Sequence, residues 1–216
     1  MAQSRGLLFL AFTAILSGYF MVWLPNESAG LAFIGLEMGE QIKFLPQVKQ
    51  RTLGPDRTLF YLPPITLALM LLLVSARWPS HRWQTWTARA LALVVSLLAF
   101  PALEQLGVAD RSEWLWRLLL ILFVGGVALV VSGIGGRISP TLLALSLLLM
   151  AVAGAVLPTW AYFSIAPTFF EWLRRPFSYG PGLWLNLAGH LLVAALAIRQ
   201  LSKEGRGGGG EAALWS

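Results

Sequence analysis

The amino-acid sequence predicts an all-α integral membrane protein, a bundle of about six transmembrane helices with two short interfacial helices on the outer face. Of its 216 residues, 57% are hydrophobic and only 12% are charged, and the apolar residues come in long runs. A soluble domain needs polar surface to cover its core, whereas a surface that faces lipid does not. The length fits a single domain.

Six apolar runs reach the roughly 18–20 residues that cross about 30 Å of hydrocarbon. They cover residues 7–24, 59–77, 88–105, 115–134, 141–162 and 183–201. The first run is expected to stay as a helix rather than to be cleaved as a signal peptide, because no small-x-small site follows it directly. Residues 1–204 then form one transmembrane domain, and the glycine-rich residues 205–216 form a flexible tail.

Prolines mark the ends of several runs. Pro63 and Pro64 fit the first turn of a helix, where backbone N–H groups have no helical partner anyway. Pro101 and Pro158 lie late in the third and fifth runs and are expected to kink or end them.

Two further segments are predicted to be interfacial helices on the outer face. Residues 29–47 are too broken by charge to cross a bilayer, but their apolar side chains fall on one helical stripe, which predicts an amphipathic helix lying on or dipping into the membrane. That stripe consists of Leu31, Ile34, Met38, Ile42 and Leu45. Gly35 and Gly39 would let another helix approach closely. Thr168 and Glu171 have the capping-box spacing, which predicts a second helix over residues 167–176.

The distribution of Lys and Arg predicts a plasma (inner) membrane protein with both termini in the cytoplasm. If the long first loop is set aside, eight basic residues lie on the side of the termini and four on the other. Tyr and Trp near the ends of the runs are expected to form a belt at the headgroup level. This belt would contain Tyr19, Trp23, Trp78, Trp83, Trp86, Trp114, Trp116, Trp160, Tyr162 and Trp184.

The strongest single candidate for function is His190, close to the middle of the last run, because an ionisable residue inside a membrane span often has a role. Asn186 lies one turn earlier on the same small and polar helix face. This face predicts either a buried ligand or proton site, or a tight packing surface on which a neutral imidazole bonds to a neighbouring helix.

Charged residues of the outer face are the next candidates for substrate or partner contacts. They include Glu37, Glu40, Glu104, Arg174 and Arg175. Glu37 or Glu40 could meet Arg174 or Arg175 in a lid over the bundle, or all of them could be ordinary solvated charges that form weak ion pairs. Arg117, one turn inside the fourth run, is expected to extend to the outer headgroups, with an anion contact as the alternative.

The sequence carries no motif for catalysis, metal binding or nucleotide binding. It has no cysteine, HExxH or GxSxG, and its net charge of +6 is spread along the chain rather than gathered into a nucleic-acid-binding face. Glycines within residues 125–137 lack the Lys-Ser/Thr of a phosphate loop and instead predict close helix packing. No cofactor is assigned.

We therefore expect a non-enzymatic membrane subunit, either a structural or accessory partner in a larger complex or the integral component of a transport system. Its partners would be membrane lipids and other membrane protein subunits. The first alternative is a self-sufficient solute-binding or permeating protein with Asn186 and His190 in its pocket. For that alternative, the architecture alone resembles the substrate-capture components of energy-coupling vitamin importers. The second alternative is a lipid-modifying enzyme that uses His190 or Glu104 as a base.

Overall fold

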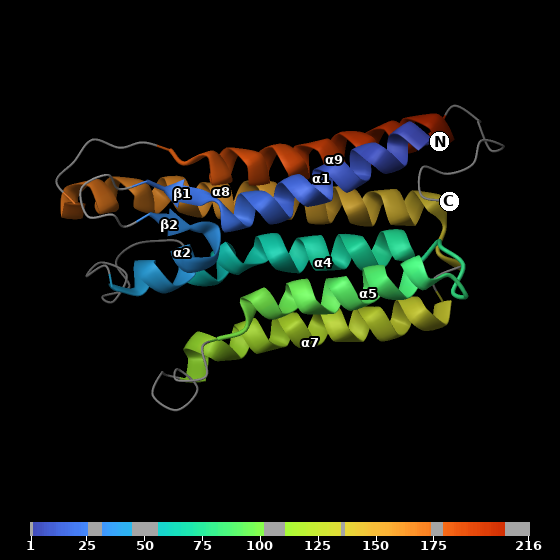
Figure 1. The fold of residues 1–216 in the computed structure, drawn as a ribbon, viewed down its shortest axis with the longest axis horizontal. Helices are drawn as coiled ribbons and strands as arrows, with labels where there is room; N and C mark the ends of the chain where they lie inside the picture. Colours follow the sequence, from blue (N-terminus) through green and yellow to red (C-terminus); the bar gives the residue numbers. More distant parts are fainter. Residues whose placement is uncertain are drawn as a thin grey trace.

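Long helices that run side by side make up most of the chain in a computed structural model (Figure 1). The structure describes residues 2–25, 32–44, 56–101, 111–134, 137–173 and 179–205. The long helices are α1 (Ala2–Phe20), α4 (Leu62–Ser75), α5 (Trp83–Ser96), α7 (Arg111–Ile134), α8 (Pro140–Leu173) and α9 (Pro181–Gly205). The shorter elements are β1 (Val22–Leu24), β2 (Phe33–Ile34), α2 (Gly35–Gln41), η1 (Ile42–Phe44), η2 (Arg57–Tyr61) and η3 (Leu97–Ala99).

Four helical stretches are long and apolar enough to cross a membrane, among the residues that the structure describes. They are Arg57–Ser75, Trp114–Gly133, Pro140–Thr168 and Pro181–Glu204. A fifth apolar helix, Arg5–Phe20, is shorter. The prediction of a mostly helical chain with apolar helices long enough to span a membrane is therefore confirmed for four of the six predicted spans. Pro63 and Pro64 lie in the first turn of α4, as expected.

The first and third runs end earlier than predicted. The run over 7–24 is not one helix: α1 stops at Phe20, and β1 pairs antiparallel with β2. Trp23 fixes this turn, because its Nε1 donates to the carbonyl of Gly18 at 2.8 Å and its own carbonyl accepts from Gly180 N at 2.8 Å. At the third run, α5 passes into η3, and Phe100 is extended, the conformation favoured before a proline. The helix thus ends before Pro101, as expected.

Helix α8 is longer than predicted and passes through both of its prolines. Pro158 and Pro167 lie inside one continuous helix that reaches Leu173. The prediction of a separate short helix over 167–176 is wrong for its described part, because Thr168 is inside α8 and caps nothing. An interior proline removes one backbone hydrogen bond, a loss that neighbouring helices and local adjustment make tolerable inside a membrane bundle.

The predicted amphipathic helix over 29–47 is shorter, and its apolar stripe faces the protein. Within its described residues 32–44, only α2 and η1 are helical, since residues 33–34 form β2. Met38 and Ile42 are fully buried in a cluster with Phe60 and Tyr162. The stripe therefore packs on the bundle instead of on lipid. Leu31 and Leu45 lie outside the described residues.

The close approach predicted at Gly35 and Gly39 is confirmed: Gly35 lies against the backbone carbonyl of Tyr19 in α1 as well as the ring of Trp23, and Gly39 lies against the ring of Tyr61. A Cβ at Gly39 would lie 2.7 Å from the ring of Tyr61, and a Cβ at Gly35 would lie 2.7 Å from Nε1 of Trp23. Any larger residue at either position would push α2 away from the bundle.

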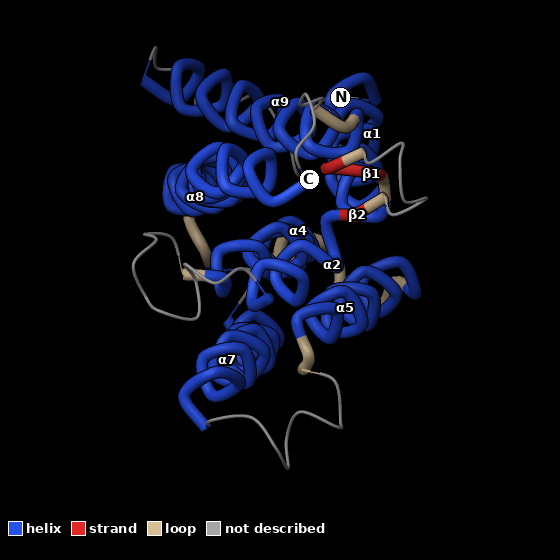
Figure 2. The backbone as a smooth tube through the Cα atoms, turned by 90° about the vertical axis from the view of Figure 1, so that its left-hand side faces the viewer, coloured by secondary structure: helices blue, strands red, loops and turns tan. Residues whose placement is uncertain are grey.

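Helix α4 is the centre of the bundle, with α1, α5, α7 and α8 packed around it (Figure 2). In its spanning stretch 72% of the residues are buried, whereas only 17% of the α7 stretch is buried. Helix α9 packs between α1 and α8 and completes that side. Much of α7 therefore faces outward, and its outward side chains are apolar.

Of the ten residues of the predicted aromatic belt, five are exposed, three are buried, and Trp78 and Trp114 are half-buried. Four of the five exposed tryptophans lie near a helix end, as a belt requires, whereas Trp160 lies inside α8. The five exposed tryptophans are Trp83, Trp86, Trp116, Trp160 and Trp184. For Tyr19, Trp23 and Tyr162 the prediction was wrong, because these side chains are buried and pack edge to face against each other. They form an internal aromatic core under α2.

Helices α1 and α9 approach so closely that their contact requires glycine. A Cβ at Gly18 would overlap the backbone nitrogen of Asn186, and a Cβ at Gly189 would lie 2.8 Å from the carbonyl of Ala11. A Cβ at Gly182 would lie 2.7 Å from the carbonyl of Gly18. We call this contact the α1–α9 seam. Gly182 and Gly189 belong to the small and polar face of the last apolar run, and here they pack tightly against α1.

We expect Gly18→Leu to lower the free energy of unfolding by about 3 kcal/mol or more, because the added side chain must separate two helix backbones. The thermal unfolding midpoint of the protein in detergent, followed by tryptophan fluorescence, measures this. Gly6→Leu is the matched control on the same helix, where a Cβ meets nothing within 4 Å. Equal midpoints for the two variants would contradict the seam.

Candidate functional site

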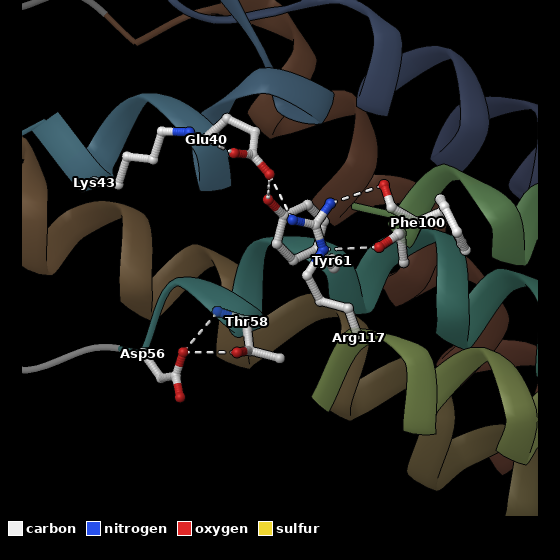
Figure 3. A network of polar contacts seen from close by, with 8 residues as sticks. Glu40, Lys43, Asp56, Thr58, Tyr61, Phe100 and Arg117 are labelled. Carbon is white, nitrogen blue, oxygen red and sulfur yellow. Dashed lines mark hydrogen bonds and ion pairs between the residues drawn. The ribbon is translucent and has the colours of Figure 1, made fainter. Parts of the chain in front are cut away.

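Arg117 is the centre of the most extensive polar network in the described part of the chain (Figure 3). Its Nη1 donates to Oε1 of Glu40 at 2.5 Å, its Nε to the carbonyl of Ala99 at 2.8 Å, and its Nη2 to the carbonyl of Phe100 at 2.9 Å. The guanidinium carbon lies 3.9 Å from the centre of the Tyr61 ring. The Tyr61 hydroxyl donates to the same Glu40 oxygen at 2.6 Å. We call these residues the Arg117 clamp.

Four segments that are distant in the sequence meet at the Arg117 clamp. Glu40 comes from α2, Tyr61 from the junction of η2 and α4, and Arg117 from α7. Ala99 and Phe100 follow α5, whose last carbonyls have no helical donors because the helix stops before Pro101. A guanidinium suits this place because it presents several donors in a fixed plane.

The prediction that Arg117 reaches the headgroups is wrong. Its side chain is only 3% exposed, and each guanidinium nitrogen has an acceptor within the protein. Acceptors inside the protein compensate for removing the charge from water, so the side chain has no need to extend to solvent. Within the chain, the carboxylate that pairs with Arg117 is Glu40, and a functional contact to another anion stays a prediction.

The remaining outer-face candidates are only partly described. Glu40 also pairs with Lys43 at 3.1 Å. Glu37 accepts from the backbone nitrogen of Ile34 at 3.4 Å, at the start of α2. Glu104, Arg174 and Arg175 lie outside the described residues, so their lid stays a prediction.

His190 lies in the middle of the bundle and uses both ring nitrogens. Its Nε2 is 3.0 Å from the hydroxyl of Thr66 on α4, and its Nδ1 is 2.9 Å from the carbonyl of Asn186, one turn earlier on α9. Gly154 of α8 lies directly against the ring, so that any side chain there would overlap it. This arrangement matches the packing interpretation, in which the imidazole bonds to a neighbouring helix.

The side chain of Asn186 is fully buried like that of His190, but its amide group has no hydrogen-bond partner in the described chain. Within the described part of the chain, neither Oδ1 nor Nδ2 makes a hydrogen bond. An unpaired buried amide costs roughly 1–3 kcal/mol. Among the predicted candidates that the structure describes, Asn186 is therefore the one whose side chain makes no hydrogen bond within the described chain.

Sequence reasoning missed Tyr61 and Thr66, the partners of Glu40, Arg117 and His190. Thr66 stands in an uncharged run, and its hydroxyl also lies within hydrogen-bond distance of the carbonyls of Leu62 and Pro63, as is common for Thr in helices. No local signal distinguishes it. The Arg117 clamp could have been anticipated from one signal, because a cation inside an apolar run needs an acidic partner.

The comparisons with known proteins assign no relationship. No protein-family model, no curated protein and no solved structure matches the chain. Among the described residues, no three His, Asp or Glu side chains are grouped so that they could hold a metal ion.

We expect Arg117→Ala to lower the free energy of unfolding by about 3 kcal/mol, the lower end of the range for breaking a buried ion pair, because Glu40 is partly exposed. Thermal unfolding in detergent measures this. Arg199→Ala is the control, since that arginine is exposed and its loss should change stability by less than about 0.5 kcal/mol.

A second variant separates the ion pair from general damage. If the unpaired Glu40 charge causes the loss, adding Glu40→Gln to Arg117→Ala should restore part of the stability. An additive further loss would mean that the two side chains act independently and would contradict the Arg117 clamp.

Proposed function

We propose that this chain is a non-enzymatic, six-pass subunit of a larger membrane assembly and that it docks through α7. The course of the helices supports six passes, because α1 and α5 run alongside the four longer stretches (Figure 1). The start of α1, the end of α9, the α4–α5 connection, the end of α7 and the start of α8 lie at one end of the bundle. Basic residues gather there: Arg5, Arg77, Arg82, Arg137, Arg199 and Lys203. By the positive-inside rule, this end faces the cytoplasm of a plasma (inner) membrane.

The observation that carries the docking proposal is the glycine face of α7. Gly126 and Gly133 are exposed, and a Cβ at either position would meet nothing within 4 Å. Leu122 and Leu129 lie on the same outward face and are 69% and 78% exposed. Each glycine costs a helix about 1 kcal/mol relative to alanine. Packing against lipid chains does not offset that cost, whereas close packing of another helix against the glycines does.

The α1–α9 seam shows what this spacing does when a partner is present. Gly182 and Gly189 are seven residues apart on α9, and both lie against the backbone of α1. Gly126 and Gly133 have the same separation on α7 without a partner in the described chain. Seven residues are two helical turns, so both glycines of each pair face one neighbour. A transmembrane helix of another subunit fits this face of α7.

The candidate residues support a non-enzymatic role. Arg117 and His190 use their polar groups in contacts within the chain, so neither offers a free group to a substrate. Intramembrane chemistry needs several reactive groups that converge on one place. In the described structure, Arg117 and His190 belong to two separate hydrogen-bond networks.

We expect a photocrosslinking amino acid at Leu129 to capture a second membrane protein in native membranes, and the same group at Leu149 of α8 to capture only lipid. Gly126→Leu with Gly133→Leu should abolish the Leu129 product, because added bulk keeps the partner helix away. Ala90→Leu with Ala188→Leu adds similar bulk at exposed positions of α5 and α9 and should leave the product unchanged.

Two outcomes would count against this proposal. Capture of lipid alone at Leu129 would leave the glycine face without a protein partner. A crosslinked product that contains only two copies of this chain would show that the glycine face mediates self-association, and would contradict docking to another subunit.

A solute-binding role is the second candidate, and the unpaired amide of Asn186 favours it. A polar solute could supply the missing partner. Asn186→Ala would then abolish uptake of a transported solute, tested with a panel of labelled amino acids and vitamins in whole cells, at wild-type expression. Uptake that is unchanged by the substitution would exclude this role.

A further inference from the structure

An apolar groove lies between α1 and α5, with α4 as its floor. Its volume is about 420 Å³, within the range of about 300–1,000 Å³ typical of small-molecule sites. Carbon atoms form nearly all of its wall. The wall includes Leu8, Phe9 and Phe12 of α1, Leu71 and Val74 of α4, and Leu91 of α5. Such a wall offers almost no hydrogen bond to a water-soluble ligand, so it selects a hydrocarbon chain.

One end of this groove is polar and basic. A smaller cavity of about 180 Å³ continues it there and shares Arg5, Trp78 and Gln84 with it. Pro79, Arg82 and Thr85 complete its described lining, and no acidic residue of the described chain lines either cavity. Within the described part of the chain, neither Arg5 nor Arg82 has an acidic partner. Two guanidinium groups at the mouth of an apolar groove therefore match a ligand with an anionic head and an apolar tail.

The start of α5 adds to the attraction for an anion. Arg82 is the residue before the first turn of α5, and no side chain caps that turn. The N-terminus of a helix carries partial positive charge and free N–H groups. Because this terminus lies between Arg82 and Gln84, it faces the same polar cavity.

The groove opens where lipid would surround the protein. Phe9 on its α1 wall is 75% exposed, and Val94 on the outer side of α5 is 60% exposed. Trp83 lines the groove near its polar end and is also exposed, as is usual for an indole at the level of the headgroups. A lipid can therefore enter sideways from the bilayer, with its head at the basic end of the bundle.

We propose that this groove binds one glycerophospholipid with an anionic headgroup. An acyl chain lies along α4, and the phosphate contacts Arg5 and Arg82. The proposal concerns a different surface from the glycine face of α7, so either proposal can fail without the other.

Native mass spectrometry of the full chain in detergent tests this with phosphatidylglycerol and with phosphatidylcholine of identical acyl chains. The wild type should retain one phosphatidylglycerol in preference to phosphatidylcholine. Arg5→Gln and Arg82→Gln should each lower that retention by about fivefold, the effect of losing one cation beside an anionic headgroup. Equal retention of the two lipids by the wild type would overturn the proposal.

Arg137→Gln with Arg199→Gln is the matched control. These arginines carry the same charge at the same end of the bundle, are exposed and do not line the groove. Phosphatidylglycerol retention should stay within about twofold of the wild type. A loss as large as the roughly fivefold loss expected for Arg5→Gln or Arg82→Gln alone would mean diffuse attraction to a basic surface and would overturn the site.

Two further arms test the tail and the head separately. Thr87 is exposed and lines the groove, so Thr87→Phe should fill it and lower retention of phosphatidylglycerol at an unchanged unfolding midpoint. Full retention in that variant would overturn the assignment of the acyl chain. Millimolar inorganic phosphate should not displace the lipid. Displacement by phosphate alone would reassign the arginines to a free anion and overturn the lipid proposal.

Discussion

The contact between Arg117 and Glu40 determines how one end of this protein is built. It fixes α2 to α7 and, through Tyr61, to the start of α4. With α2 in place, Met38 and Ile42 close over the aromatic core around Trp23. The guanidinium also takes the carbonyls that α5 leaves free, so a single side chain serves the ion pair and the end of a helix. A position that is costly for a charge becomes acceptable because acceptors surround it.

Much of the helical architecture could be predicted, because a run of about 20 apolar residues matches the thickness of a bilayer and is too apolar for the surface of a soluble protein. The polar contacts could not. Arg117 and Glu40 are separated by 77 positions in the sequence, and each alone is an ordinary residue near a membrane face. Periodicity correctly placed Met38 and Ile42 on one stripe, but it could not say whether lipid or Trp23 would cover that stripe. Pro158 does not end its helix for a related reason, since the cost of a proline depends on neighbouring helices.

The outward surface of the bundle is apolar throughout its middle, but two regions of it have distinctive features. On α7 the face has the same glycine spacing that joins α9 to α1, yet no helix of the described chain occupies it. Between α1 and α5 the surface is hollow, and basic side chains stand at one end. A bilayer accounts for the apolar character of both regions. It does not account for the glycines or the arginines, which indicate particular neighbours.

The length of α8 has a consequence for the shape of the protein in a membrane. Its 34 residues extend about 50 Å at about 1.5 Å per residue, whereas the hydrocarbon layer is about 30 Å thick. In a bilayer of this thickness, a modest tilt would absorb only part of the excess, and one end of α8 would protrude from the membrane. The protrusion lies at the end that holds α2 (Figure 1). A molecule approaching from that side meets a fixed projection before it reaches the lipid surface.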